Sequence, residues 1–238
     1  MSQYEGLSLF YDQLTFDQPY ESWLKIVEHF APHHHSLLDI GCGTGNLTTL
    51  LTQFDNVTGM DLSVDMLSLA ANKAHNINWI EGDMTDFTLN SKFDVITIFC
   101  DSLNYLADLE DVKATFTNVY HHLEDNGVLM FDVHTINKFD TLFNNQSYID
   151  ETDEVFLGWD AIRGEEPYSV WHDMSFFMKQ SNDLYQRFDE SHYQRTFTED
   201  TYKKLLNDIG FTNITTFVDF DINNHDENGN RLFFIVNK

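Results

Sequence analysis

The residues best suited to chemistry lie in a glycine-rich stretch that follows a short apolar run. Gly41, Gly43 and Gly45 come directly after Leu37–Ile40, and a helical pattern is expected from Leu47. Glycine lets the backbone turn sharply and approach a ligand closely, and the N–H groups at the start of a following helix face that ligand. The stretch is therefore a candidate binding loop, although a strand-to-helix turn without a ligand has the same local pattern.

Two carboxylates follow the loop at the ends of the next two predicted strands. Asp61 comes after Val57–Met60, about twenty residues past the first glycine, which is the spacing of a carboxylate that binds ribose hydroxyls. Asp83 follows the run Ile77–Ile80. Because parallel sheets bind ligands beyond the carboxyl ends of their strands, we expect the loop, both carboxylates and Cys100–Asp101 to converge on one crevice. Taken singly, Asp61 could cap the next helix and Asp83 could close a turn.

The order of the glycines separates this loop from those that bind dinucleotides. Asn46 directly follows the third glycine, so the pattern is Gly-x-Gly-x-Gly and lacks the glycine that completes the pyrophosphate-binding order. The loop therefore indicates a pocket for a nucleoside without a pyrophosphate. A nucleotide-dependent oxidoreductase is the disfavoured alternative, which binding of NAD would reinstate.

With these motifs the chain resembles class I S-adenosylmethionine-dependent methyltransferases, over residues 37–134 and the terminal strand–helix–strand pattern. Within that family it is most similar to small bacterial methyltransferases with an inserted antiparallel cap. The motifs of this closer resemblance are Tyr11-Asp12, Cys100–Tyr105, Phe131–His134, His172–Phe177 and Arg187–Glu190.

The resemblance implies S-adenosyl-L-methionine as the cofactor. It implies that Gly41, Gly43 and Gly45 border the methionine part, and that Asp39 bonds near its amino group. The full set of implied cofactor-binding residues is Tyr11, Asp39, Gly41, Cys42, Gly43, Gly45, Asp61, Leu62, Asp83, Met84, Cys100 and Asp101.

Further roles in the same set follow from the resemblance. It implies that Asp61 binds the ribose hydroxyls. It also implies that Asp83 accepts a hydrogen bond from the adenine amino group while the Met84 backbone reads the ring edge. Cys100–Asp101 would flank the cofactor, and Tyr11 would close over it.

No residue is assigned a catalytic role from the sequence. Methyl transfer is an in-line displacement on a sulfonium, which needs an aligned nucleophile and exclusion of water more than a strong base. His134 and His172 are candidates for a proton acceptor, because imidazole titrates near neutral pH, yet a lone histidine is more often structural. Asn104 and Tyr105 are candidates for orienting an acceptor.

The charge balance bears on the acceptor. The chain has 13 Lys and Arg against 39 Asp and Glu, a formal charge of −26, whereas phosphate backbones require clustered Lys and Arg. Residues 100–105 also lack the Asn/Asp-Pro-Pro-Tyr motif of relatives that methylate DNA bases. A small-molecule acceptor is therefore favoured over DNA. The alternatives are an RNA or protein acceptor, and a cofactor-binding regulatory or partner-binding protein without turnover.

The elements that must position these residues alternate strand and helix, which predicts an α/β fold. We expect a Rossmann-like, doubly wound, mostly parallel seven-stranded sheet carrying an inserted antiparallel β cap. In this scheme 1–149 hold N-terminal helices and the cofactor-binding core, 150–197 the cap and 198–238 the end of the core. The predicted strands of the sheet are Ser36–Ile40, Val57–Met60, Ile77–Ile80, Phe93–Phe99, Val128–Val133, Phe211–Phe220 and Arg231–Asn237.

The predicted cap replaces the helical period by period-two alternation. Its strands Tyr168–Lys179 and Leu184–Phe197 are expected to join through a turn at 181–183. We expect the cap to cover the acceptor pocket, the alternative being an oligomer interface. Arg187 could clamp a substrate anion, but neutralising Asp173 or Asp189 is the preferred interpretation.

Other features of the sequence bear on the location of the protein in the cell and on metal binding. The chain begins without a basic segment followed by an apolar run, and its apolar stretches are shorter than the roughly 20 residues that span a bilayer. With only Cys42 and Cys100, no disulfide framework is available, so a soluble cytoplasmic protein is expected. The consecutive histidines 33–35 cannot converge on one tetrahedral centre, so no metal is expected. No oligomeric state is predicted.

Overall fold

The computed structural model describes Asp12 and residues 18–32, 35–180 and 184–238. Three expectations lie outside these residues: the closing role of Tyr11, the loop at 33–34 and the turn at 181–183.

The larger sheet has seven strands. Their bounds are β1 Ser36–Ile40, β2 Asn56–Asp61, β3 Asn78–Glu81, β4 Phe93–Ile98, β5 Leu123–His134, β10 Thr212–Val218 and β11 Arg231–Asn237. The order across the sheet is β10-β11-β5-β4-β1-β2-β3. Only β11 runs antiparallel to its neighbours β5 and β10, so the predicted Rossmann-like, mostly parallel sheet is confirmed.

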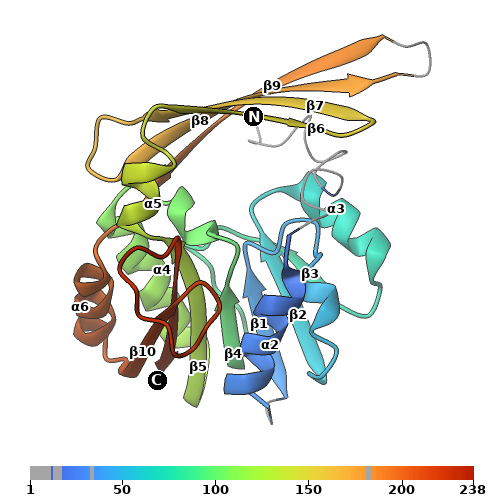
Figure 1. Ribbon diagram of the computed structural model, residues 1–238. Helices are drawn as coiled ribbons and strands as arrows, with labels where there is room; N and C mark the ends of the chain where they lie inside the picture. Colours follow the sequence, from blue (N-terminus) through green and yellow to red (C-terminus); the bar gives the residue numbers. More distant parts are fainter. Residues whose placement is uncertain (1–11, 13–17, 33–34, 181–183) are drawn as a thin grey trace.

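Helices cover both faces of this sheet (Figure 1). On one face, α2 (Tyr20–Phe30) packs Trp23 and Val27 into a core cluster with β-strand residues. On the other face, α4 (Leu109–His122) and α6 (Glu199–Ile209) pack around Phe116 and Tyr202. A shorter helix, α3 (Val64–Lys73), packs beside β2 and β3. Within the described part of the chain, no helix is long and apolar enough to cross a membrane.

The helix expected from Leu47 is wrong. The chain forms only a single 3₁₀ turn, η1 (Thr48–Leu50), before β2 begins. The hydroxyl of Thr48 donates to the buried Asp39 at 2.6 Å, and two adjacent β-branched residues, Thr48 and Thr49, favour a longer helix poorly. This bond ties the end of the glycine stretch to β1.

A second, four-stranded antiparallel sheet forms the cap. Its strands are β6 Gln146–Glu151, β7 Val155–Arg163, β8 Ser169–Lys179 and β9 Tyr185–Arg195, in sequence order. The short helix α5 (Ile136–Thr141) leads into it from β5. Figure 1 shows the cap lying across one end of the larger sheet. A bond from Gln194 to Asp101, which follows β4, identifies this as the carboxyl end. The cap sheet starts at Gln146, and the division of the chain at 150 and 197 stays a prediction.

The packing of α4 against the sheet gives a stability prediction. The Phe116 ring is fully buried and lies 5.2 Å from that of Phe131, centroid to centroid. Phe116→Ala should lower the free energy of unfolding by about 3–5 kcal/mol, because it leaves a cavity at the centre of the core. Urea unfolding measures this. Leu109→Ala, on the exposed start of the same helix, is the control and should cost about 1 kcal/mol or less; equal losses would contradict the assignment of Phe116 to the core.

Candidate active site

The glycine stretch forms a left-handed loop that is closed at its ends and open in the middle. Gly41, Gly43 and Gly45 have φ values of +71°, +54° and +76°, a region that favours glycine. A Cβ on Gly41 would lie 2.6 Å from Ser102 Oγ, and one on Gly45 would lie 2.6 Å from the Trp79 ring. A Cβ on Gly43 would meet nothing within 4 Å. Gly43 therefore offers bare backbone to a ligand.

Asp61 clamps this loop from the end of β2. Its Oδ2 accepts a hydrogen bond from the Gly43 N–H at 2.8 Å, and its Oδ1 accepts one from the Ser63 N–H at 2.8 Å. Burial raises the pKa of Asp61, an effect that these backbone donors oppose. The next side chain, Leu62, is 68% exposed. The loop thus has a carboxylate and an uncovered apolar side chain beside its open centre.

Asp39 lies below the loop in the interior. Its two oxygens accept hydrogen bonds from Thr48 Oγ1 at 2.6 Å and Thr97 Oγ1 at 2.7 Å. Burial raises the pKa of Asp39 to about 6. Asp39 therefore joins η1 to β4 beneath the glycine stretch.

The residues after β3 lie at the same edge of the sheet. Asp83 is exposed, and its Oδ1 accepts from both the N–H and the hydroxyl of Thr85 at 2.8 and 2.7 Å. The Met84 side chain reaches to within 3.9 Å of the Cβ position at Gly41. The Sγ of Cys42 lies 3.1 Å from the Cβ position at Gly59 in β2.

Cys100 and Asp101 follow β4 with left-handed backbones, at φ +55° and +53°. Such a conformation costs on the order of 1–3 kcal/mol for a non-glycine residue unless its surroundings enforce it. Here both N–H groups donate to Asp132, at 3.0 and 3.1 Å. Ser102, which begins the 3₁₀ turn η2 (Ser102–Tyr105), donates from Oγ to the Gly41 carbonyl at 3.3 Å. The strained turn thus contacts the glycine loop directly.

Sequence reasoning missed the group that holds this turn. Asp132 is fully buried in β5 and also accepts from Trp23 Nε1 at 2.8 Å. Arg231 bonds Asp132 and, at 2.9 Å, Asp101, and its guanidinium lies 5.1 Å from the Trp23 ring centroid. Burial opposes its charge, but the two carboxylates raise the pKa of Arg231 above its ordinary value. An aspartate inside an otherwise apolar strand was the signal for this cluster.

The four catalytic candidates lie between the core and the cap. Asn104 is fully buried, donates to the Arg195 carbonyl at 2.7 Å and accepts from the His134 N–H at 2.9 Å. It therefore joins β9 to β5. Tyr105 is half-buried and packs edge-on against the ring of His192 at 5.9 Å.

Both candidate histidines are buried in contact with protein groups. His134 Nε2 lies 3.3 Å from Asp101 Oδ2, and its Nδ1 lies 3.3 Å from Lys138 Nζ. His172 Nδ1 accepts from Trp159 Nε1 at 3.0 Å. Burial lowers the pKa of each imidazole to about 4, so both are neutral at pH 7.

Two further sequence predictions concern charged side chains. Arg187 bonds Asp189 at 2.8 Å while both are more than half exposed, so the preferred interpretation, neutralisation of an aspartate, describes its contacts. His35, from the histidine run, has its Nδ1 2.8 Å from Asp55 Oδ2.

The chain is similar to several known proteins. Residues 37–127 match a family described as a methyltransferase domain. The chain is 37% identical over 240 residues to YqeM of Bacillus subtilis, whose assigned name is that of a methyltransferase, covering 99% of this chain and 97% of YqeM. A crystal structure of an S-adenosylmethionine-dependent methyltransferase from Clostridium acetobutylicum covers 96% of both chains at 31% identity, with a TM-score of 0.87. The chain belongs to the S-adenosylmethionine-dependent methyltransferases.

This methyltransferase is also similar to an amino-sugar enzyme over part of its length. It is 34% identical over 108 residues to the dTDP-3-amino-3,4,6-trideoxy-alpha-D-glucopyranose N,N-dimethyltransferase of Streptomyces venezuelae, covering 45% of this chain and 46% of that enzyme.

The residues at the carboxyl edge fit the cofactor of this methyltransferase. The open backbone at Gly43 is a cradle that a larger residue would fill, the Asp61 carboxylate can accept from hydroxyls, and Leu62 offers an apolar surface. Thiol, thioether and carboxylate groups around the loop suit a nucleoside bearing a methionine side chain better than a pyrophosphate.

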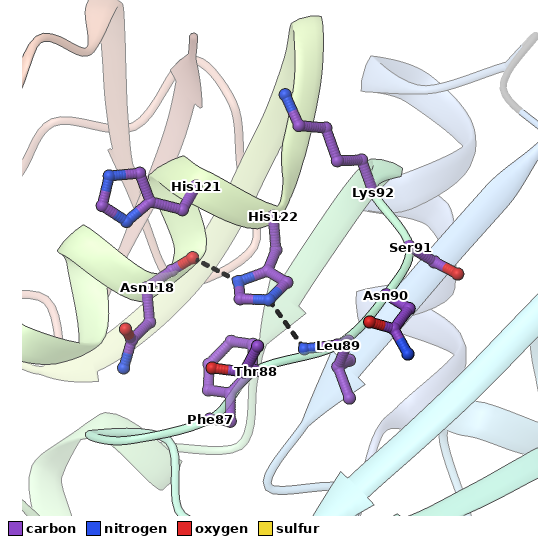
Figure 2. Close-up of a pocket in the computed structure, with 9 residues that line it drawn as sticks. All are labelled: Phe87, Thr88, Leu89, Asn90, Ser91, Lys92, Asn118, His121 and His122. Carbon is purple, nitrogen blue, oxygen red and sulfur yellow. Dashed lines mark hydrogen bonds between the residues drawn. The ribbon is translucent and has the colours of Figure 1, made fainter.

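A separate groove of about 430 Å³ lies away from this edge (Figure 2). It runs between the end of α4 and residues 87–92, which lead into the start of β4. The His122 ring lines it and accepts from the Leu89 N–H at 2.9 Å. None of the predicted site residues lines this groove.

Because His134 and His172 are buried, we expect the free energy of unfolding to fall in acid. In the unfolded chain His134 and His172 take up protons near pH 6.5, but in the folded chain only near pH 4. The unfolded state therefore binds more protons between these values, and each histidine removes about 3 kcal/mol as the pH falls from 6.5 to 4. Asp39 acts oppositely, because its pKa of about 6 lets the folded state bind a proton first.

Urea unfolding at a series of pH values tests this balance. His172→Gln should reduce the loss of stability between pH 6.5 and 4 by about 3 kcal/mol. Asp39→Asn is the counterpart of opposite sign and should make the loss steeper. A pH dependence that neither substitution alters would show that these groups do not titrate as their burial requires.

Proposed function

We propose that this protein transfers a methyl group from S-adenosyl-L-methionine to an amine of a small molecule, at the carboxyl edge of the larger sheet beneath the cap. The observation that carries the proposal is the clamp between Asp61 Oδ2 and the Gly43 N–H, at 2.8 Å, beside backbone that no side chain covers. It combines a fixed loop with room for a ligand.

Each residue at this edge is given a role toward the cofactor. Gly41, Gly43 and Gly45 border its methionine part, and Asp61 binds the ribose hydroxyls beside its loop contact. Leu62, 68% exposed, covers one face of the adenine. Asp83 and Met84, at the end of the next strand, read the edge of that ring. The set is completed by residues that hold the glycine loop and the turn after β4 in place. These are Asp39, Cys42 and Cys100–Asp101.

The amine acceptor is supported by two observations. The Streptomyces venezuelae relative is named for N,N-dimethylation of an amino sugar. The formal charge of −26 also attracts the cationic ammonium form of a small amine. An alkylammonium must first release its proton to solvent, because only the neutral nitrogen has a lone pair that can attack.

When bound, S-adenosyl-L-methionine supplies an electrophilic methyl group on a sulfonium. The chain has to align the acceptor nitrogen with that methyl and exclude water, since the displacement itself needs little covalent assistance. The cap covers the edge where this happens (Figure 1). Tyr105, half-buried at the end of η2, is the candidate that we retain for orienting the acceptor.

We also propose a cytoplasmic location for the enzyme. Its two cysteines, Cys42 and Cys100, are free thiols, as is usual in a reducing compartment.

Calorimetric titration with S-adenosylhomocysteine tests the cofactor site. Asp61→Ala should weaken binding at least tenfold, about 1.4 kcal/mol, because it removes both the ribose acceptor and the clamp on Gly43. Leu62→Ala removes a side chain that is 68% exposed, and should weaken binding about threefold to tenfold through lost apolar contact with the cofactor.

The matched control is Asp65→Ala, an exposed aspartate in the first turn of α3, which should bind like the wild type. Unchanged affinity in both Asp61→Ala and Leu62→Ala would place the cofactor elsewhere. Turnover is then sought with a panel of amino sugars and other small amines.

A further inference from the structure

A buried chain of hydrogen bonds links the cap to the turn after β4. Trp159 Nε1 donates to His172 Nδ1 at 3.0 Å, so the proton of this neutral imidazole resides on Nε2. His172 Nε2 lies 3.2 Å from Gln194 Oε1 and donates to it. Gln194 Nε2 in turn donates to Asp101 Oδ2 at 2.9 Å. The direction of each bond is thus fixed from the cap to the core.

Asp101 divides its carboxylate between the two parts of the protein. Oδ2 accepts from Gln194 of the cap and also lies 3.3 Å from His134 Nε2 of β5, whereas Oδ1 accepts from Arg231 of β11 at 2.9 Å. The backbone N–H of Asp101 is meanwhile held by Asp132. Burial opposes ionisation, but the hydrogen bond with His134 and the charge of Arg231 hold the pKa of Asp101 well below its usual range. The cap therefore bonds a carboxylate whose charge and backbone are already fixed by the core.

Ser102, the residue after Asp101, connects the turn after β4 to the glycine loop. The single hydroxyl proton of Ser102 is shared between the Phe99 carbonyl, at 2.8 Å from Oγ, and the Gly41 carbonyl, at 3.3 Å. Ser102 also occupies the space that a Cβ on Gly41 would need. A shift of the left-handed turn at Asp101 would therefore move the wall against which Gly41 packs.

We propose that Gln194 is a positioning residue of the cofactor site: through Asp101 and Ser102 the cap holds the Gly41 end of the glycine loop in its binding conformation. Docking of the cap and binding of S-adenosyl-L-methionine are then coupled, and the coupling is reciprocal. This inference rests on the cofactor site proposed above. Gln194 contributes through its amide alone, without contact to the cofactor.

An isosteric substitution separates this role from packing. Gln194→Glu keeps the shape of the side chain but sets a carboxylate against Asp101 Oδ2, which repels it until it takes up a proton. The charged and titratable groups around this position are Asp101 ahead of η2, His134 on β5, Lys138 on α5, His172 on β8, His192 on β9 and Arg231 on β11. The protonated form can again donate to Asp101 and accept from His172.

The experiment measures the affinity for S-adenosylhomocysteine at pH 8.0 and 5.5, with circular dichroism to confirm folding. Gln194→Glu should bind at least tenfold more weakly than the wild type at pH 8.0 and within about threefold of it at pH 5.5. Gln194→Leu should bind weakly at both values. The matched control is Gln186→Glu, the same change at an exposed position of β9, which should follow the wild type.

Hydrogen exchange on the wild type tests the reciprocal half without a substitution. Saturating S-adenosylhomocysteine should slow exchange in β8 around His172, and Gln194→Leu should abolish that protection. If the wild type binds and both Gln194 variants bind equally well at both pH values, the positioning role is wrong and the proposed function stands. If the wild type does not bind, both fail.

Discussion

The site depends on the neutralisation of one carboxylate inside the larger sheet. Asp132 is fully buried, and an unpaired charge there would cost several kcal/mol. Trp23, Arg231 and the N–H groups of Cys100 and Asp101 all bond it. These four donors come from α2, from β11 and from the turn after β4, so satisfying one charge fixes three segments at the edge that we propose binds the cofactor. The left-handed turn at Cys100–Asp101 is stabilised because any other backbone conformation would remove two hydrogen-bond donors from the Asp132 carboxylate.

From this cluster the interactions extend in two directions. Ser102 links the turn after β4 to the glycine loop through its contact with Gly41, and Gln194 links the same turn to the cap through its hydrogen bond to Asp101. The neutral histidines at 134 and 172 serve this arrangement, because burial keeps them uncharged and gives each ring a defined donor and acceptor side. A methyltransferase that relies on alignment and exclusion of water needs such rigidity more than it needs a strong base. The polar interior between core and cap is thus suited to holding geometry.

Local patterns were sufficient to predict the frame of this site. Strand alternation, three glycines and the spacing to Asp61 are read within a few dozen residues, and they set the parallel sheet and its carboxyl edge. The cluster around Asp132 could not be found in this way, because its partner Arg231 is distant in sequence and reaches Asp132 only when β11 pairs with β5. The helix predicted from Leu47 was wrong because a threonine hydroxyl bonds Asp39 instead. The cap strand β6 is almost wholly exposed, without the alternation that marks a buried face.

The position of Arg231 at the start of the last strand has a consequence for biosynthesis. A ribosome releases the glycine loop, Asp61 and the turn after β4 long before it releases β11, which must then insert between β10 and β5. Until that insertion Asp132 and Asp101 lack their guanidinium partner. The nascent chain therefore emerges with all three glycines of the loop in place but without the guanidinium that bonds Asp101 and Asp132. On the site that we propose, competence to bind the cofactor therefore depends on the insertion of β11.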